Sequence, residues 1–402
     1  MKRPLFYSLP PAGNKIPIGT VARATKAKGT RSMMWLGPIE RLLGTKHILY
    51  LSSGRASLWL ILKALSKTRP DKEEVIIPAY TCPAVASAVL KAGLKPVLSD
   101  ISLRHFGFAL NDLATKINRH TLAIVVVHLF GYPADMERVI ELGEQQNYFV
   151  IEDAAQAFGN TPLDSSDKKL GLLGDAGFYS FGRGKPISVM HGGLLVTNSE
   201  EIYREALKIN NRLNHAANNH YLKYLLLLGS YSLFHNPHMY WIPQMIPFLH
   251  LGETIFESNF PTAEGLALAA WVLHELVQSL KTDQETRKTN SHWFATNLSD
   301  MPGAERPPHS AYPYLRYPLI VKEEKLRDRI LEKLVSQGTG AALFYPCPLN
   351  ELPRLKEILQ DATIYPNARR LSETLITLPV HAGLTSSLRH KILTLIDREL
   401  RR

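Results

Sequence analysis

The chain has 402 residues, of which 45% are hydrophobic and 21% are charged, a composition that is typical of a globular protein and excludes a disordered one. Its 47 Lys and Arg against 36 Asp and Glu give a formal net charge of +11. The chain has only two cysteines, which is too few for a disulfide framework, so we expect a cytoplasmic, reducing setting.

The N-terminal stretch, residues 1–44, is a basic arm. Its first 39 residues contain no Asp or Glu but carry Lys2, Arg3, Lys15, Arg23, Lys26, Lys28 and Arg31. Such an arm suits phosphates, nucleic acid or an anionic membrane surface, and a solvated terminal segment is the alternative. Because no zinc-finger spacing or other nucleic-acid motif is present, we expect no nucleic-acid partner. Prolines and polar residues interrupt the first positions, so we expect no secretory signal.

Residues 48–197 alternate between short apolar runs and helix-like stretches. The runs EVIIPAY, KPVLSD, LAIVVVHLFG and YFVIEDAA are rich in Val and Ile. Buried parallel strands have continuous apolar sequences, since helices cover both faces of their sheet. The pattern therefore predicts an α/β domain with a mostly parallel sheet, whose sites lie at the carboxyl ends of strands. Four residues stand at such ends: Tyr80, Asp100, His128 and Asp153.

The segment 224–252 contains no Lys, Arg, Asp or Glu. Its length would span a bilayer, but three prolines and several polar residues interrupt it, which argues against a spanning helix. Short amphipathic pieces that cover a groove, a subunit contact or a membrane surface fit the pattern better.

The remaining sequence completes the expected domain plan. Residues 263–300 predict one or two long helices, and the following residues predict a smaller α+β domain. We therefore expect a basic arm at 1–44, a large cofactor-binding domain at 45–255 with an apolar insertion at 220–252, and a linking helix with a small C-terminal domain at 256–402.

One lysine, Lys185, lies in the glycine-rich stretch SFGRGKPISVMHGG. A phosphate-binding loop requires G-x-x-x-x-G-K-S/T, but Tyr179 replaces its first glycine and Pro186 follows the lysine, so that interpretation fails. A lysine that bonds a carbonyl must be held at a fixed, partly desolvated point. If the carbonyl belongs to pyridoxal phosphate, an acidic residue must keep the ring nitrogen protonated. Asp153 suits that task, although an aspartate at a strand end is also commonly a cap or structural acceptor.

Eight blocks of sequence carry a family resemblance. In chain order they are SSGRASLWL, EVIIPAYT, KPVLSDI, VVHLFGYPADM, VIEDAAQAFG, GDAGFYSF followed by Lys185, GGLLVTN and LPVHAGLT. From about residue 45 onward, the chain resembles the pyridoxal-phosphate-dependent sugar aminotransferases of the DegT/StrS type, a branch of the fold-type-I aminotransferases. The combination of EDAAQ, SF-x-x-x-K and GG is specific, whereas any one block alone would be weak.

The resemblance implies a role for each matching residue. Lys185 would occupy the Schiff-base position and move the proton between substrate and cofactor, while Asp153 would pair with the pyridinium nitrogen. Gln156 would lie near the ring hydroxyl. Asn259 would reach the phosphate of the second subunit, which implies a homodimer with a shared active site. The cofactor phosphate would bind at a helix start, through Gly54, Arg55, Ala56 and Ser180.

Four positions depart from the family's pattern. Cys82 replaces an aromatic residue that stacks on the ring, so it would contact the cofactor without π-stacking. Arg55 stands where many members have threonine. The usual N-Y-R-M reads N-F-P-T at 259–262, which loses an arginine, and H-Y-P-P reads F-Y-P-C at 344–347. Because these positions surround the substrate in the family, the departures weaken the substrate assignment more than the cofactor assignment.

Two histidines receive a structural interpretation or no role. We expect His128 to be structural or to pack at a subunit contact, and we assign no role to His191. The cysteines and histidines show no metal-ligand spacing, so we expect no metal.

The resemblance implies an aminotransferase that takes an amino group from glutamate and aminates a keto sugar nucleotide for surface polysaccharide or cell-envelope glycan. One alternative is a pyridoxal-phosphate enzyme acting on a non-sugar or lipid-linked keto substrate. Dehydrating relatives carry histidine in place of the lysine, so Lys185 argues against a dehydratase. A second alternative is a non-catalytic regulatory protein of the same fold. The uncharged segment leaves open both peripheral contact with the inner membrane face and burial at a dimer interface.

Overall fold

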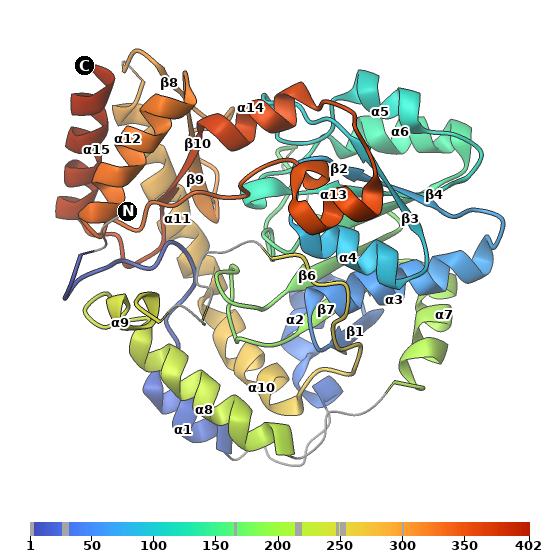
Figure 1. Cartoon of the computed structure of the whole chain (residues 1–402). Helices are drawn as coiled ribbons and strands as arrows, with labels where there is room; N and C mark the ends of the chain where they lie inside the picture. Colours follow the sequence, from blue (N-terminus) through green and yellow to red (C-terminus); the bar gives the residue numbers. More distant parts are fainter. Residues whose placement is uncertain are drawn as a thin grey trace.

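The computed structural model describes residues 4–25, 32–164, 167–213, 219–246, 249, 255–299 and 301–402. In this part of the chain, a central sheet of seven strands and a second sheet of three strands are packed with helices (Figure 1). The central strands, in the order in which they pair, are β1 (Ile48–Leu51), β7 (Gly193–Thr197), β6 (Ala176–Ser180), β5 (Phe149–Asp153), β4 (Thr121–Val127), β2 (Glu74–Pro78) and β3 (Lys95–Ser99).

The central sheet is mostly parallel, as the apolar runs predicted. Strands β3, β2, β4, β5 and β6 pair in parallel, whereas β7 runs antiparallel to both β6 and β1. The register places Val127 opposite Asp153, and Asp153 opposite Phe178. Residues that follow these strands therefore meet at one edge of the sheet, where ligands bind in folds of this kind.

Helices cover both faces of the central sheet. Along β4, Ile124 and Val126 pack into one apolar core, and Val125 and Val127 pack into another. Burial on both faces explains why this strand has a continuous apolar sequence. The helices up to the linker are α1 (Ile18–Ala24), α2 (Gly37–Leu43), α3 (Gly54–Thr68), α4 (Pro83–Lys91), α5 (Leu110–Lys116), α6 (Met136–Gln146), α7 (Glu200–Asn210), α8 (Asn219–Phe234) and α9 (Trp241–Gln244).

The second sheet lies in the C-terminal part of the chain and is antiparallel, in the order β10 (Leu375–Pro379), β9 (Arg316–Val321) and β8 (Ala304–Glu305). The predicted fold class is confirmed: a large α/β part with a mostly parallel sheet is joined to a smaller α+β part. The domain boundaries at 44 and 255 stay predictions. The helices from the linker onward are α10 (Ala267–Leu276), α11 (Leu280–Asn297), α12 (Glu324–Ser336), α13 (Pro353–Leu359), α14 (Pro366–Thr374) and α15 (Ser386–Leu400).

The described part of the N-terminal arm is a packed strap. The Ser8 N–H donates to the Pro237 carbonyl at 2.8 Å, and the Leu9 N–H donates to the Gly338 carbonyl at 2.9 Å. Leu9 and Ile16 are buried. The strap therefore joins the segment after α8 to the C-terminal part, and it is not a solvated tail.

The predicted apolar insertion forms α8 and α9, and α8 lies beside α1 (Figure 1). Residues 247–248 and 250–252 of the insertion lie outside the described residues. No helix in the described ranges is both long and apolar enough to cross a membrane.

Candidate active site

Lys185 lies in the loop between β6 and β7, and hydrogen bonds between side chains and the backbone hold this loop at the lysine and just after it. The Lys185 N–H donates to Ser188 Oγ at 3.1 Å, and the Ser188 N–H donates to Asn14 Oδ1 in the N-terminal strap. The buried Arg287 donates from Nη2 to the Pro186 carbonyl at 2.8 Å. Gly184 has φ +73°, a left-handed conformation that favours glycine, so the residue before the lysine makes the turn possible.

Asp153 ends β5, and its carboxylate is buried. Its Oδ1 accepts the Ala155 N–H at 3.0 Å, and among the described residues no donor bonds its Oδ2. Burial raises the pKa of Asp153, while the charge of Lys185 and the Ala155 N–H oppose the rise. A buried carboxylate with one open oxygen fits a ring N–H, because a cationic partner would keep it ionised.

Cys82, Gln156 and Tyr345 lie around the same carboxylate and amine. Burial raises the pKa of Cys82, and the Lys185 charge opposes that rise. Gln156 accepts the Phe130 N–H at 3.0 Å and donates from Nε2 to Tyr345 Oη at 3.5 Å. Burial raises the pKa of Tyr345 well above its usual value, with further contributions from Cys82 and Asp153. The structure thus brings Cys82 and Gln156 together with Lys185 and Asp153.

The predicted phosphate-binding residues meet where α3 begins. Ser53 caps α3, since its Oγ accepts the Ala56 N–H at 3.2 Å, which leaves the N–H groups of Gly54 and Arg55 without an intrahelical acceptor. A Cβ at Gly54 would lie 2.8 Å from Ser180 Cβ. The close approach of Ser180 to these amides forms a cradle that suits a phosphate group.

Two predicted residues have side-chain partners outside this cluster. The Arg55 side chain turns to Glu257, with Nη1 at 2.6 Å from Oε2, and its guanidinium stands 5.0 Å from the centre of the Phe260 ring. Asn259 is exposed and accepts a hydrogen bond from Lys91 Nζ at 2.9 Å, at the end of α4. Within one chain, Asn259 is therefore not brought to Lys185.

Two strand-end residues are structural. His128 is buried, its Nδ1 accepts the Ala134 N–H at 3.1 Å, and its Nε2 therefore donates to Glu152 at 2.8 Å. Asp100 accepts the N–H groups of Asn367 and Ala368 at the start of α14. In the part of the chain that the structure describes, no group of three or more His, Cys, Asp or Glu could hold a metal ion.

Arg316 is a site residue that the motifs did not single out. It begins β9, and its Nη2 lies 4.0 Å from where a Cβ at Gly184 would stand, beside the lysine loop. Its guanidinium lies 5.7 Å from the centre of the Phe344 ring. Burial lowers the pKa of Arg316, and no ion pair to it forms within the described residues. The sequence YLRYPLIV predicts only a strand there, so no sequence signal marked this arginine.

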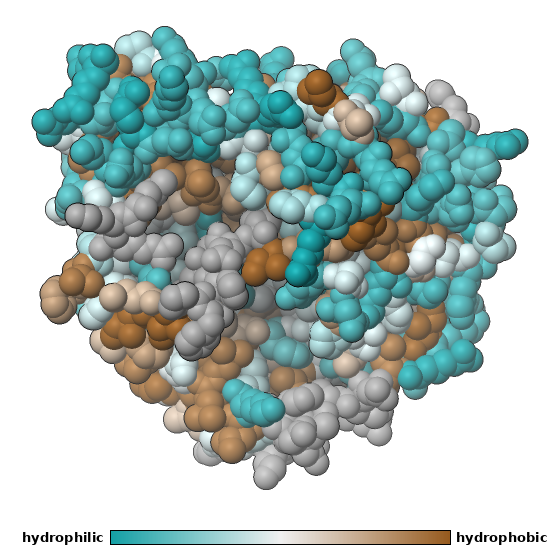
Figure 2. Space-filling model, viewed as in Figure 1, coloured by the Kyte–Doolittle hydropathy of each residue, from teal (hydrophilic) through white to brown (hydrophobic). Residues whose placement is uncertain are grey.

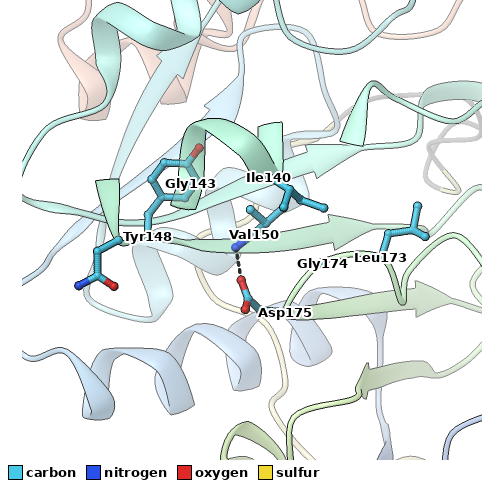
Figure 3. A pocket seen from close by; sticks show the side chains of 8 residues that line it. Ile140, Gly143, Tyr148, Val150, Leu173, Gly174 and Asp175 are labelled. Atoms are coloured by element: carbon cyan, nitrogen blue, oxygen red, sulfur yellow. Dashed lines mark hydrogen bonds between the residues drawn. The ribbon is translucent and has the colours of Figure 1, made fainter. Parts of the chain in front are cut away.

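A pocket of about 460 Å³ lies at the other end of β5. Tyr148, Val150 and Asp175 line it, and Asp175 Oδ2 accepts the Val150 N–H at 2.7 Å (Figure 3). Since Asp153 stands at the carboxyl end of this strand, the pocket is separate from the lysine cluster and belongs to the opposite edge of the sheet.

The fold and this cluster define the chain as a pyridoxal-phosphate-dependent enzyme of the aminotransferase class. The model of the DegT/DnrJ/EryC1/StrS aminotransferase family matches residues 27–232 and 266–396. The chain therefore belongs to that family and is an aminotransferase whose cofactor is pyridoxal phosphate.

Relatives with named activities match most of the chain. UDP-N-acetyl-3-dehydro-α-D-glucosamine 3-aminotransferase of Acidithiobacillus ferrooxidans is 28% identical over 365 residues, which cover 90% of this chain and 86% of that protein. GDP-perosamine synthase of Caulobacter vibrioides is 28% identical over 363 residues, which cover 89% and 86%. Among solved structures, Helicobacter pylori PseC, an aminotransferase of pseudaminic acid biosynthesis, has a TM-score of 0.77 at 20% identity and covers 100% of both chains.

Proposed function

We propose that the protein transfers an amino group from glutamate to a keto group of a nucleotide-linked sugar, in the synthesis of surface polysaccharide or cell-envelope glycan. The observation that carries this proposal is the convergence of Lys185, Asp153 and the Ser180 cradle at one edge of the sheet. The sugar substrate is supported by relatives whose names specify UDP-, GDP- and dTDP-linked sugars.

Each residue would have a separate role in this reaction. Ser180 and the free N–H groups at the start of α3 would hold the cofactor phosphate. Asp153 would offer its open oxygen to the ring nitrogen and hold a proton there. When bound, pyridoxal phosphate would supply an electron sink for the bond that breaks at the substrate carbon. Lys185, held by its anchored loop, would hold the cofactor through Nζ and would carry the proton that moves at the substrate carbon.

Arg316 supplies the positive charge that an anionic substrate needs in this cleft. Glutamate carries carboxylates, and a guanidinium binds a carboxylate through two parallel hydrogen bonds. Since burial lowers its pKa and no acidic side chain of the described residues pairs with it, a bound carboxylate would compensate the buried charge. We assign Arg316 to the carboxylate of the amino donor.

The shared homodimeric site and the cellular setting belong to the same proposal. Asn259 is exposed and lies away from Lys185 of its own chain. This supports a role at the phosphate of a partner subunit. We propose a cytoplasmic enzyme with peripheral contact to the inner face of the membrane.

A panel of keto-sugar nucleotides with glutamate as donor, read by product mass, tests the proposed reaction. We expect an amino sugar nucleotide to form and Lys185→Ala to abolish both turnover and the visible absorbance of the lysine-bound cofactor. If glutamate leaves the absorbance of the wild-type protein unchanged, glutamate is not the amino donor. If glutamate changes it but no sugar nucleotide is aminated, the acceptor is of another class. A normal lysine-bound spectrum in Lys185→Ala would contradict the assignment of the lysine.

A further inference from the structure

Helix α8 carries large apolar side chains on both its buried and its exposed sides. One face carries Tyr224, Leu228 and Tyr231, which are buried against the protein. On the other side, Leu222 and Leu226 are both 64% exposed. In a soluble protein, the outer face of a surface helix is normally polar, because only one stripe of the helix packs on the core. The outer face of α8 is therefore unlike that of an ordinary surface helix.

Neighbouring residues extend this apolar face. Leu233, in the last turn of α8, is 53% exposed, and Ile18 of α1 is 70% exposed. Because α1 packs beside α8, these side chains belong to one region of the surface. Figure 2 shows hydrophobic side chains gathered over this region, at the lower left of the molecule. We call the residues Ile18, Leu222, Leu226 and Leu233 the α8 face.

The charged side chains near the α8 face are basic. Between residues 219 and 246, Lys223 is the one Lys, Arg, Asp or Glu, and it is exposed. Arg183 is also exposed, and its charge acts on Tyr231, which lies on the buried side of the same helix. Glu275, the acid that faces α1, is already paired with Arg23 at 2.8 Å.

We propose that the α8 face docks on an anionic phospholipid bilayer, with α8 lying in the plane of the interface. Apolar side chains that enter the acyl boundary, together with cations that meet lipid phosphates, are the features of interfacial helices. A two-fold contact with a second copy would instead place each basic surface against the same basic surface. The inference does not depend on the reaction, since α8 docks whether or not the substrate is a sugar nucleotide.

The test is flotation of the full-length, cofactor-loaded protein with vesicles. One set of vesicles is a roughly two-to-one mixture of phosphatidylcholine and phosphatidylglycerol, and the other is phosphatidylcholine alone. We expect binding to the anionic vesicles that weakens as salt concentration rises. Leu222→Glu/Leu226→Glu should weaken this binding by about tenfold or more, because two carboxylates would replace the inserted leucines.

Ile358→Glu/Ile364→Glu is the matched control, since both isoleucines are exposed and lie away from α8, Ile358 in α13 and Ile364 just before α14 (Figure 1). It should bind vesicles as the wild type does. Circular dichroism and the cofactor absorbance check folding, and Ser230→Glu, on the exposed face of α8, serves if the double variant fails to fold.

Two outcomes would overturn the proposal. The first is a wild-type protein that does not float with anionic vesicles. If the α8 variant then also has a changed solution mass in light scattering, the α8 face is a contact between copies of the chain. The second is a folded α8 variant that binds vesicles as tightly as the control.

Discussion

The site depends on one residue that has no side chain. Gly54 lies so close to Ser180 that a methyl group would stand 2.8 Å from Ser180 Cβ, and Ser180 is one wall of the phosphate cradle. We therefore expect Gly54→Ala to displace Ser180 and weaken pyridoxal phosphate binding by about tenfold or more, because one good phosphate contact contributes on the order of 1.5–3 kcal/mol. Titration of the cofactor-free protein, followed by absorbance, measures this change.

The same substitution elsewhere provides the control. Gly229 lies inside α8 with nothing within 4 Å of where its Cβ would stand. Gly229→Ala should leave cofactor affinity unchanged and raise the free energy of unfolding by roughly 0.5–1 kcal/mol, as alanine favours a helix over glycine. Equal cofactor affinity in Gly54→Ala and Gly229→Ala would show that the cradle does not hold the phosphate.

Arg316 allows a second test at the level of single residues. We expect Arg316→Gln to weaken the binding of glutamate by roughly tenfold or more, since a buried carboxylate would lose a charged, bidentate partner. Stopped-flow absorbance of the reaction with glutamate alone separates this effect from the sugar half of the reaction. Arg329→Gln, at an exposed arginine of α12, should behave as the wild type. If Arg316→Gln leaves glutamate affinity unchanged but alters sugar affinity, Arg316 binds the sugar acceptor and not the amino donor.

At the scale of elements, the N-terminal strap is bonded to a buried histidine. His381 follows β10 and donates from Nε2 to the Pro10 carbonyl at 2.8 Å, while its Nδ1 accepts the Gly383 N–H at 3.1 Å. Burial lowers the pKa of His381 to about 4. An imidazole with both nitrogens protonated could still donate to Pro10 but could not accept the Gly383 N–H, so this pair of hydrogen bonds requires the neutral form.

This histidine predicts a loss of stability in mild acid. Its pKa in the folded protein lies below the ordinary value near 6.5, so between about pH 6.5 and pH 4 the unfolded chain binds more protons than the folded one. Stability is then complete above that window and falls as pH decreases through it, by about 2 kcal/mol between pH 7 and pH 5. Urea unfolding at both pH values measures the change.

A variant identifies the group responsible for this pH dependence. His381→Gln should be less stable than the wild type at pH 7 and should lose less stability on going to pH 5. His120→Gln, at an exposed histidine, should retain the full pH dependence. If the two variants have the same dependence, a different group causes it.

The elements also show what sequence can predict. The strands were predictable because each depends on a local pattern, a continuous apolar run, and the place of Lys185 in a loop after a strand follows from the same pattern. The role of Lys185 stays a prediction. The partners of the strap were not predictable, since the His381–Pro10 hydrogen bond joins residues 371 positions apart. Arg316 escaped prediction for the same reason, because what distinguishes it is the distant lysine loop and not its own strand.

At the scale of the whole molecule, the proposed shared site can be tested by mixing variants. A dimer of one Lys185→Ala subunit and one Asn259→Ala subunit would contain one site with both residues intact. Coexpression of the two variants should therefore restore about a quarter of wild-type activity if subunits pair at random in a two-fold dimer. Activity no greater than the sum of the two separate variants would show that Asn259 acts, if at all, within its own chain.

The strap also determines how late in synthesis the active-site loop can reach its final structure. Asn14 is among the first residues to be synthesised, yet the strap to which it belongs is held by Gly338 and His381, which are among the last. A segment of the chain can pack only on residues that have already been synthesised. The strap that carries Asn14, and with it the hydrogen bond from Ser188 to Asn14, can therefore take its final position only when translation is almost finished. A nascent chain that stops short of these residues would carry the catalytic lysine without the scaffold that fixes it.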